Sequence, residues 1–89
     1  MNSFNIVIDP LAEKDLKKFK RSNPKLLSRL INAINSLTHS PYQGKPLKGD
    51  KKGCYSLREA DDYRIIYEIY PAQKTIHIIR VGHRREIYR

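Results

Sequence analysis

The fold is decided by residues 54–81, whose sequence reads CYSLREADDYRIIYEIYPAQKTIHIIRV. Runs rich in β-branched and aromatic residues predict strands here, at about 54–59, 63–70 and 75–81. The segments between them, 60–62 and 71–74, are short enough to be hairpin turns. The stretch therefore predicts consecutive antiparallel strands.

Upstream of this stretch, the pattern predicts a short strand that runs straight into a helix. Phe4, Ile6 and Ile8 occupy alternate positions, which is the period of a half-buried strand. Asp9 then supplies a helix N-cap, and Pro10 suits the first helical position. The helix is expected to run to about residue 21, with its apolar face made of Ala12, Leu16 and Phe19.

A second helix begins at Ser22-Asn23-Pro24, where the cap and the proline are repeated. Its apolar residues follow a 3.6-residue period, at Leu26, Leu27, Leu30, Ile31, Ile34 and Leu37. The two helices are close enough in sequence to form an antiparallel hairpin. The order β-α-α-β-β-β predicts an α+β fold, in which this hairpin packs on one face of a small, mainly antiparallel sheet. Residues 1–89 are expected to form a single domain.

Residues 38–53 predict a basic loop, because prolines and glycines interrupt every periodic pattern there. Its lysines are Lys45, Lys48, Lys51 and Lys52. Lysines in such a loop are more typical of a solvated surface than of specific ligands. They can still attract phosphates through their summed charge, and we expect this of Lys48, Lys51 and Lys52.

The expected strand register lines up arginines on one face of the sheet. A turn centred on Asp61 pairs Arg58 with Arg64, and a turn centred on Ala72 pairs Arg64 with Arg80. Like charges directly opposite one another lower the stability of a sheet by up to about 1 kcal/mol per pair, unless an anion or an acidic partner neutralises them. The row therefore predicts an anion site.

The same register divides the remaining strand residues between two faces. The arginine face also carries Cys54, Ser56, Ile66, Glu68 and Ile78. The opposite face is apolar and is the predicted core, with Tyr55, Leu57, Tyr63, Ile65, Tyr67, Ile69, Ile79 and Val81.

The overall composition favours a polyanionic or strongly acidic partner. Eighteen Lys and Arg against nine Asp and Glu give a formal charge of +9. The single cysteine, Cys54, cannot form an intrachain disulfide, and no segment has the pattern of a signal peptide or a membrane span. We therefore expect a protein of the reducing cytoplasm with no membrane partner.

The C-terminal stretch, residues 80–89, carries four arginines, a histidine and a tyrosine behind the last predicted strand. Arginine forks match phosphate oxygens, and the near-neutral pKa typical of histidine would suit His83 to proton transfer. His39 and His77 have no metal-ligand spacing with each other or with Cys54, so we interpret them as structural and expect no metal site.

Four segments together resemble the RelE/ParE superfamily of bacterial and archaeal toxins from toxin–antitoxin pairs. They are LKG (47–49), YSLR (55–58), DYRIIYEI (62–69) and VGHRREIY (81–88). Their order and their position after two helices cover nearly the whole chain. The sequence is most similar to the RelE branch, whose members cleave messenger RNA in the ribosomal decoding site.

The resemblance implies which residues act in RNA cleavage. Its motifs place the catalytic set at Arg58, Arg64, His83, Arg84 and Tyr88. Arg80 and Arg85 are expected to bind RNA with the loop lysines, and Arg85 could substitute for Arg84. Ser56 departs from the pattern, because well-known ribosome-dependent members carry a proton-transferring lysine there. The identity of the general base therefore stays open.

The implied chemistry requires neither metal nor cofactor, because the 2′-hydroxyl of the RNA attacks the adjacent phosphorus. Fixed arginines can stabilise the charge that develops on the nonbridging oxygens. Tyr88 or His83 is available for proton transfer, but the Tyr88 ring could instead stack on a base.

Two other functions compete with the ribonuclease. The ParE branch of the superfamily poisons DNA gyrase, although the set of Arg58, Arg64, Arg84 and Tyr88 favours the nuclease. Alternatively, a noncatalytic basic module could bind an antitoxin and help repress its operon. The resemblance implies a RelB-like or similar antitoxin as partner, with the ribosome, messenger RNA and, through the antitoxin complex, operator DNA.

Overall fold

The computed structural model describes residues 3–88, and its elements follow the predicted order with short additions. Met1, Asn2 and Arg89, the last residue of the basic C-terminal stretch, lie outside the described residues. The predicted elements are β1 (Asn5–Ile8), α1 (Pro10–Ser22), α2 (Pro24–Ser36), β3 (Cys54–Glu59), β4 (Tyr63–Tyr70) and β5 (Thr75–His83). The additions are β2 (Lys45–Pro46), the 3₁₀ turn η1 (Gly49–Lys51) and α3 (Arg84–Ile87).

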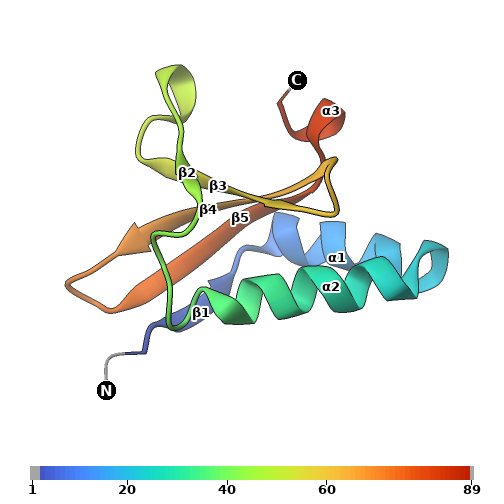
Figure 1. The fold of residues 1–89 in the computed structure, drawn as a ribbon, viewed down its shortest axis with the longest axis horizontal. Helices are drawn as coiled ribbons and strands as arrows, with labels where there is room; N and C mark the ends of the chain where they lie inside the picture. The colour runs from blue at the N-terminus through green and yellow to red at the C-terminus, as the bar shows by residue number, and fades with distance from the viewer. Residues whose placement is uncertain (1–2, 89) are drawn as a thin grey trace.

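The strands form a mixed sheet in the order β1-β5-β4-β3-β2. β1 runs parallel to β5, and the other neighbouring strands are antiparallel. Figure 1 shows α1 and α2 over one face of the sheet, while α3 and the segment around η1 rise from the opposite face. The expected α+β fold is confirmed. Within residues 3–88, no helix has the length and apolar character needed to cross a membrane.

Both long helices begin at the caps that the sequence predicts. The Asp9 side chain accepts a hydrogen bond from the Leu11 amide at 2.9 Å, and the Asn23 side chain accepts one from the Leu26 amide at 3.2 Å. Each cap is followed by a proline in the first turn. Asn23 also ends α1, because its own amide donates to the Phe19 carbonyl. One residue therefore ends α1 and caps α2.

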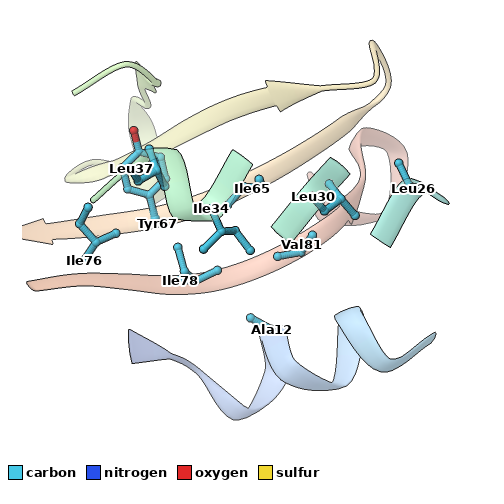
Figure 2. Close-up of a cluster of buried hydrophobic side chains, with 10 residues drawn as sticks. All are labelled: Ala12, Leu26, Leu30, Ile34, Leu37, Ile65, Tyr67, Ile76, Ile78 and Val81. Carbon is cyan, nitrogen blue, oxygen red and sulfur yellow. The ribbon is translucent and has the colours of Figure 1, made fainter. Parts of the chain in front are cut away.

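The core lies between the helical hairpin and the sheet. Figure 2 shows its buried side chains, which are Ala12, Leu26, Leu30, Ile34, Leu37, Ile65, Tyr67, Ile76, Ile78 and Val81. Burying a large apolar side chain of this kind contributes about 1.5–3 kcal/mol before the entropy of ordering is subtracted. The predicted apolar faces of both helices and of β4 all contribute to this cluster.

The register of the first hairpin is as predicted, and that of the second is not. Arg58 pairs with Arg64 across β3 and β4. The predicted pairing of Arg64 with Arg80 is wrong, because Arg64 lies opposite Gly82 and Arg80 lies opposite Ile66.

The error in register has two physical causes. The turn between β4 and β5 has four residues, so that Tyr70 pairs with Thr75, and a bulge then leaves Ile79 unpaired between Ile78 and Arg80. As a result, Ile78 packs in the core rather than on the arginine face, and Ile79 does not hold the core position predicted for it.

The predicted basic loop is partly ordered as an additional strand. Lys45 pairs with Ser56 and Pro46 with Tyr55, and Pro46 is tolerated because β2 is the edge of the sheet. The buried Tyr67 hydroxyl accepts from the Gly44 amide at 3.0 Å and donates to the Pro41 carbonyl at 2.8 Å. Burial raises the pKa of Tyr67, which keeps the donating proton in place. This tyrosine therefore ties β2 to the core.

Candidate active site

A pocket of about 480 Å³ involves the β2 segment and the residue that follows α3. Figure 1 shows that the β2 segment and α3 rise from the face of the sheet opposite α1 and α2. The pocket is lined by Lys45, Leu47, Ser56, Arg58, Arg64 and Tyr88. These residues come from β2 and its continuation, from β3 and β4, and from the residue that follows α3. The pocket therefore depends on segments far apart in the sequence.

Two arginines form the floor of the pocket. Arg58 and Arg64 are directly opposite one another on β3 and β4. The Nη1 atom of Arg64 donates to the carbonyls of Asp61 at 2.6 Å and Tyr63 at 3.0 Å, so the turn holds this guanidinium in a fixed orientation. Arg58 is exposed. Two like charges side by side favour a bound anion, which removes their mutual repulsion.

Tyr88 closes the pocket through a hydrogen bond to Ser56. The Ser56 Oγ and Tyr88 Oη atoms lie 2.6 Å apart, and either hydroxyl can be the donor. Ser56 is only 8% exposed and anchors the bond, whereas Tyr88 is 44% exposed, so its ring remains accessible to a ligand. The tyrosine hydroxyl is thereby held beside the two arginines.

The short helix α3 brings Tyr88 back over the sheet. A Cβ atom added to Gly82 would lie 3.6 Å from two side-chain carbons of Ile87, which shows that Ile87 packs over this glycine. Gly82 is the residue opposite Arg64. The missing side chain at the predicted third arginine position therefore makes room for α3.

His83 begins α3 and lies outside the lining of the pocket. Its Nδ1 atom accepts from the Arg85 amide at 3.1 Å, and its ring meets the edge of Tyr63 at a centroid distance of 5.4 Å. Arg84 Nε lies 3.4 Å from an Asp62 carboxylate oxygen, and both side chains are about half exposed. The structure thus places His83 and Arg84 beside the turn that orients Arg64, rather than in the pocket itself.

The predicted RNA-binding residues are separated by the fold. Lys48, Lys51 and Lys52 are exposed around η1, on the same side of the sheet as the pocket, and Arg85 is exposed on α3.

Arg80 instead forms a two-bond ion pair with the buried Asp15 of α1, at 2.8 and 3.1 Å. Asp15 also accepts from the Val81 amide at 3.0 Å, and its hydrogen bond to Arg80 is the main cause of the raised pKa of Arg80. Arg80 is therefore directed to the helical layer.

The sequence predicts Lys45 to be a solvated loop residue, but the structure brings it to the pocket. A strand of two residues carries no periodic pattern, so only its pairing with Ser56 reveals its position. Ser56 departs from the family pattern, and the sequence does not predict its hydrogen bond to Tyr88. Cys54 lies on the same strand but is a poor nucleophile, because burial raises the pKa of its thiol, and Glu68 raises it further against the effect of Lys51.

Residues 6–88 match the family described as the ParE toxin of the type II toxin–antitoxin system parDE, and the chain belongs to this family.

Among its relatives are the toxins RelG and RelE of Mycobacterium tuberculosis. RelG is 36% identical over 80 residues, which cover 88% of this chain and 87% of that protein. RelE is 28% identical over 88 residues, covering 97% of this chain and 87% of that protein.

Solved structures show the same fold. The toxin–antitoxin complex RelBE2 from M. tuberculosis contains a chain with a TM-score of 0.82 and 31% identity, and the match covers 94% of both chains. The YoeB/ParE toxin from Agrobacterium tumefaciens has a TM-score of 0.80 at 20% identity, covering 90% of this chain and 98% of that one. The chain is a toxin of a type II toxin–antitoxin system, similar to the toxins RelG and RelE.

Proposed function

We propose that this toxin is a metal-independent endoribonuclease that cleaves messenger RNA on the ribosome. The observation that supports this most directly is the pocket that unites the paired guanidinium groups of Arg58 and Arg64 with the hydroxyl of Tyr88. The resemblance to the RelE branch supports the same substrate. A phosphodiester is an anion that two neighbouring guanidinium groups can bind.

In the proposed reaction the 2′-oxygen forms a bond to phosphorus while the bond to the 5′-oxygen breaks. The products are a 2′,3′-cyclic phosphate and a free 5′-hydroxyl, so one proton leaves the 2′-hydroxyl and another reaches the 5′-oxygen. Arg58 and Arg64 stabilise the charge that grows on the nonbridging oxygens. The turn holds Arg64 in place beforehand, so little reorganisation is needed in the transition state.

Tyr88 has two proposed roles that can be separated. Its hydroxyl can donate to the reacting phosphate or the leaving oxygen, because the bond to Ser56 places it in the pocket. Its exposed ring can stack on a base beside the scissile bond. His83 and Arg84 complete the proposed catalytic set from the rim, where they hold α3 and the turn next to Arg64.

The exposed cations around the pocket are proposed to hold the rest of the RNA. Lys48, Lys51, Lys52 and Arg85 lie on the same side of the sheet as the pocket and can contact ribosomal or messenger RNA phosphates. Arg80 is also predicted to bind RNA, but its side chain forms an ion pair with Asp15. We therefore propose that Arg80 attracts RNA only through long-range electrostatics.

A cognate antitoxin is the proposed protein partner. The related toxin in the RelBE2 structure is bound in a toxin–antitoxin complex. The charge of +9 favours an acidic antitoxin segment, of the RelB type or similar, and the complex could in turn bind operator DNA. Coexpression of the neighbouring small reading frame should abolish toxicity, and unchanged toxicity would contradict this partner.

The experiment that tests the function incubates the purified protein with messenger RNA, with and without programmed ribosomes. We expect cleavage only with ribosomes and loss of cleavage in Arg58→Ala. A parallel reaction with gyrase and supercoiled DNA tests the second candidate, a gyrase poison, which the ParE family match favours. Gyrase inhibition without RNA cleavage would overturn the ribonuclease.

A further inference from the structure

Lys45 occupies a fixed position that its place in a lysine-rich loop does not suggest. Its strand is hydrogen-bonded to β3 by the pairing with Ser56, and the Leu47 amide donates to the Cys54 carbonyl at 2.9 Å beyond it. On the other side, Gly44 is bound to the buried hydroxyl of Tyr67. The backbone of Lys45 is therefore held at both ends by buried or paired groups.

The strand register directs the Lys45 side chain to the pocket. Residues directly opposite one another on antiparallel strands point to the same face, with Cβ atoms about 4.5–5.5 Å apart. Lys45 is opposite Ser56, and Ser56 carries the hydrogen bond to Tyr88. The lysine stem therefore lines the same pocket as the tyrosine hydroxyl and the arginine pair.

The charged side chains that line the pocket are all positive. Among residues 3–88, the lining includes the cations Lys45, Arg58 and Arg64 and no carboxylate side chain. The carboxylates nearest in sequence to the arginines have other partners, since Glu59 binds Arg29 and Asp62 binds Arg84. A third cation in the lining increases the attraction for an anion that bridges all three.

We propose that Lys45 binds a nonbridging oxygen of the phosphodiester held by Arg58 and Arg64, as a third cation of the site. This inference rests on the proposed function for its substrate. An ammonium group is a compact charge on a flexible stem, so it can follow the phosphate as the geometry at phosphorus changes, whereas the arginine forks hold it in orientation. The ribonuclease site then spans three neighbouring strands, β2, β3 and β4.

The test compares Lys45→Met, Lys45→Arg and the control Lys14→Met. Lys14 is exposed on α1, on the opposite side of the sheet, so its replacement makes the same change in net charge away from the pocket. The probe is a 2′-deoxy dinucleotide, which offers the phosphodiester but cannot be cleaved. Its affinity is measured by NMR titration, and single-turnover cleavage is measured on saturated ribosomes.

Loss of a charge-assisted hydrogen bond should weaken dinucleotide binding about tenfold or more in Lys45→Met and slow cleavage at least as much. Lys45→Arg should retain most of both, and Lys14→Met should change neither by more than about twofold. Unchanged binding in Lys45→Met, or an equal loss in Lys14→Met, would overturn the proposal. If the wild type binds the dinucleotide through Lys45 but cleaves no RNA, the proposed function fails and the phosphodiester site stands.

Discussion

The two faces of the sheet are built in different ways. The face under α1 and α2 is a continuous apolar layer whose members are read from local periodicity, as Leu30, Ile65 and Val81 illustrate. The opposite face holds a basic pocket that includes residues of the β2 segment and Tyr88 after α3, and these segments are short and without periodic patterns. The apolar face of this small sheet can therefore be predicted from local sequence patterns, whereas the pocket face depends on contacts between segments far apart in the sequence.

The largest expected effect is a loss of RNA cleavage in a variant of the pocket face that keeps the stability of the folded protein. Arg64→Ala should lower ribosome-dependent cleavage about 10²- to 10³-fold, because it removes a fixed donor to the transition state. The melting temperature should change little, since the Arg64 side chain donates its hydrogen bonds to carbonyls of the adjoining turn and is not part of the core. Rate measurements at saturating ribosomes test the first claim and thermal denaturation the second. Wild-type cleavage by both Arg64→Ala and Arg58→Ala would remove the arginine pair from the site.

Tyr67→Phe tests whether the two faces are coupled through the loop at Gly44. Removing the buried hydroxyl leaves the Gly44 amide and the Pro41 carbonyl without this partner and should cost about 1–3 kcal/mol of stability. Because the same bond holds β2, cleavage should also fall. Denaturant unfolding and cleavage assays measure the two effects. Tyr42→Phe is the control, since its ring is exposed in the same loop and its loss of a hydroxyl should cost less than about 0.5 kcal/mol. A stability loss with full activity would show that the faces are independent.

Tyr88 separates hydrogen bonding from stacking on the pocket face. We expect a mixed role with stacking the larger part, so Tyr88→Ala should abolish most single-turnover cleavage and Tyr88→Phe should slow it by about tenfold. Ser56→Ala should resemble Tyr88→Phe, because it releases the same hydroxyl. The double variant Ser56→Ala/Tyr88→Phe should then be no slower than either single variant. Rapid cleavage by Tyr88→Ala would exclude the residue from the site.

Arg80→Ala tests whether Arg80 stabilises the fold through Asp15 of α1 rather than binding RNA. Loss of its bonds to Asp15 should reduce stability by about 1 kcal/mol, discounted because the Arg80 side chain is 39% exposed. Cleavage should change by less than about threefold. A large fall in RNA affinity with unchanged denaturant stability would return Arg80 to the RNA-binding surface.

The smallest effect is expected from the lysines around η1. Lys51→Ala and Lys52→Ala should each weaken binding to single-stranded RNA modestly and reduce the dependence of log K on log salt by about 0.7, the value for one phosphate contact. Stability should be unchanged, because both side chains are exposed. An unchanged salt slope would show that these lysines serve solubility alone.

The helix caps, the strand alternation and the first hairpin depend on residues close together in the chain, so the amino-acid sequence alone predicts them. Asp9 and Asn23 cap the helices because a cap needs only the next turn. The alternation in β4 predicted Ile65 and Tyr67 in the core, and the short turn at Asp61 predicted the pairing of Arg58 with Arg64. The family resemblance added the toxin class, which the match over residues 6–88 confirms.

Only the tertiary structure decided which cations share the pocket. The bulge at Ile79 placed Gly82 rather than Arg80 opposite Arg64, where Ile87 packs, and Asp15 of α1 binds the Arg80 side chain. The buried hydroxyl of Tyr67 tied down the segment that carries Lys45. The physical reason is that a one-residue change of register moves every following side chain to the other face. The register of β5 is therefore selected by the burial of Ile78 and Val81 in a core whose other members come from distant parts of the chain.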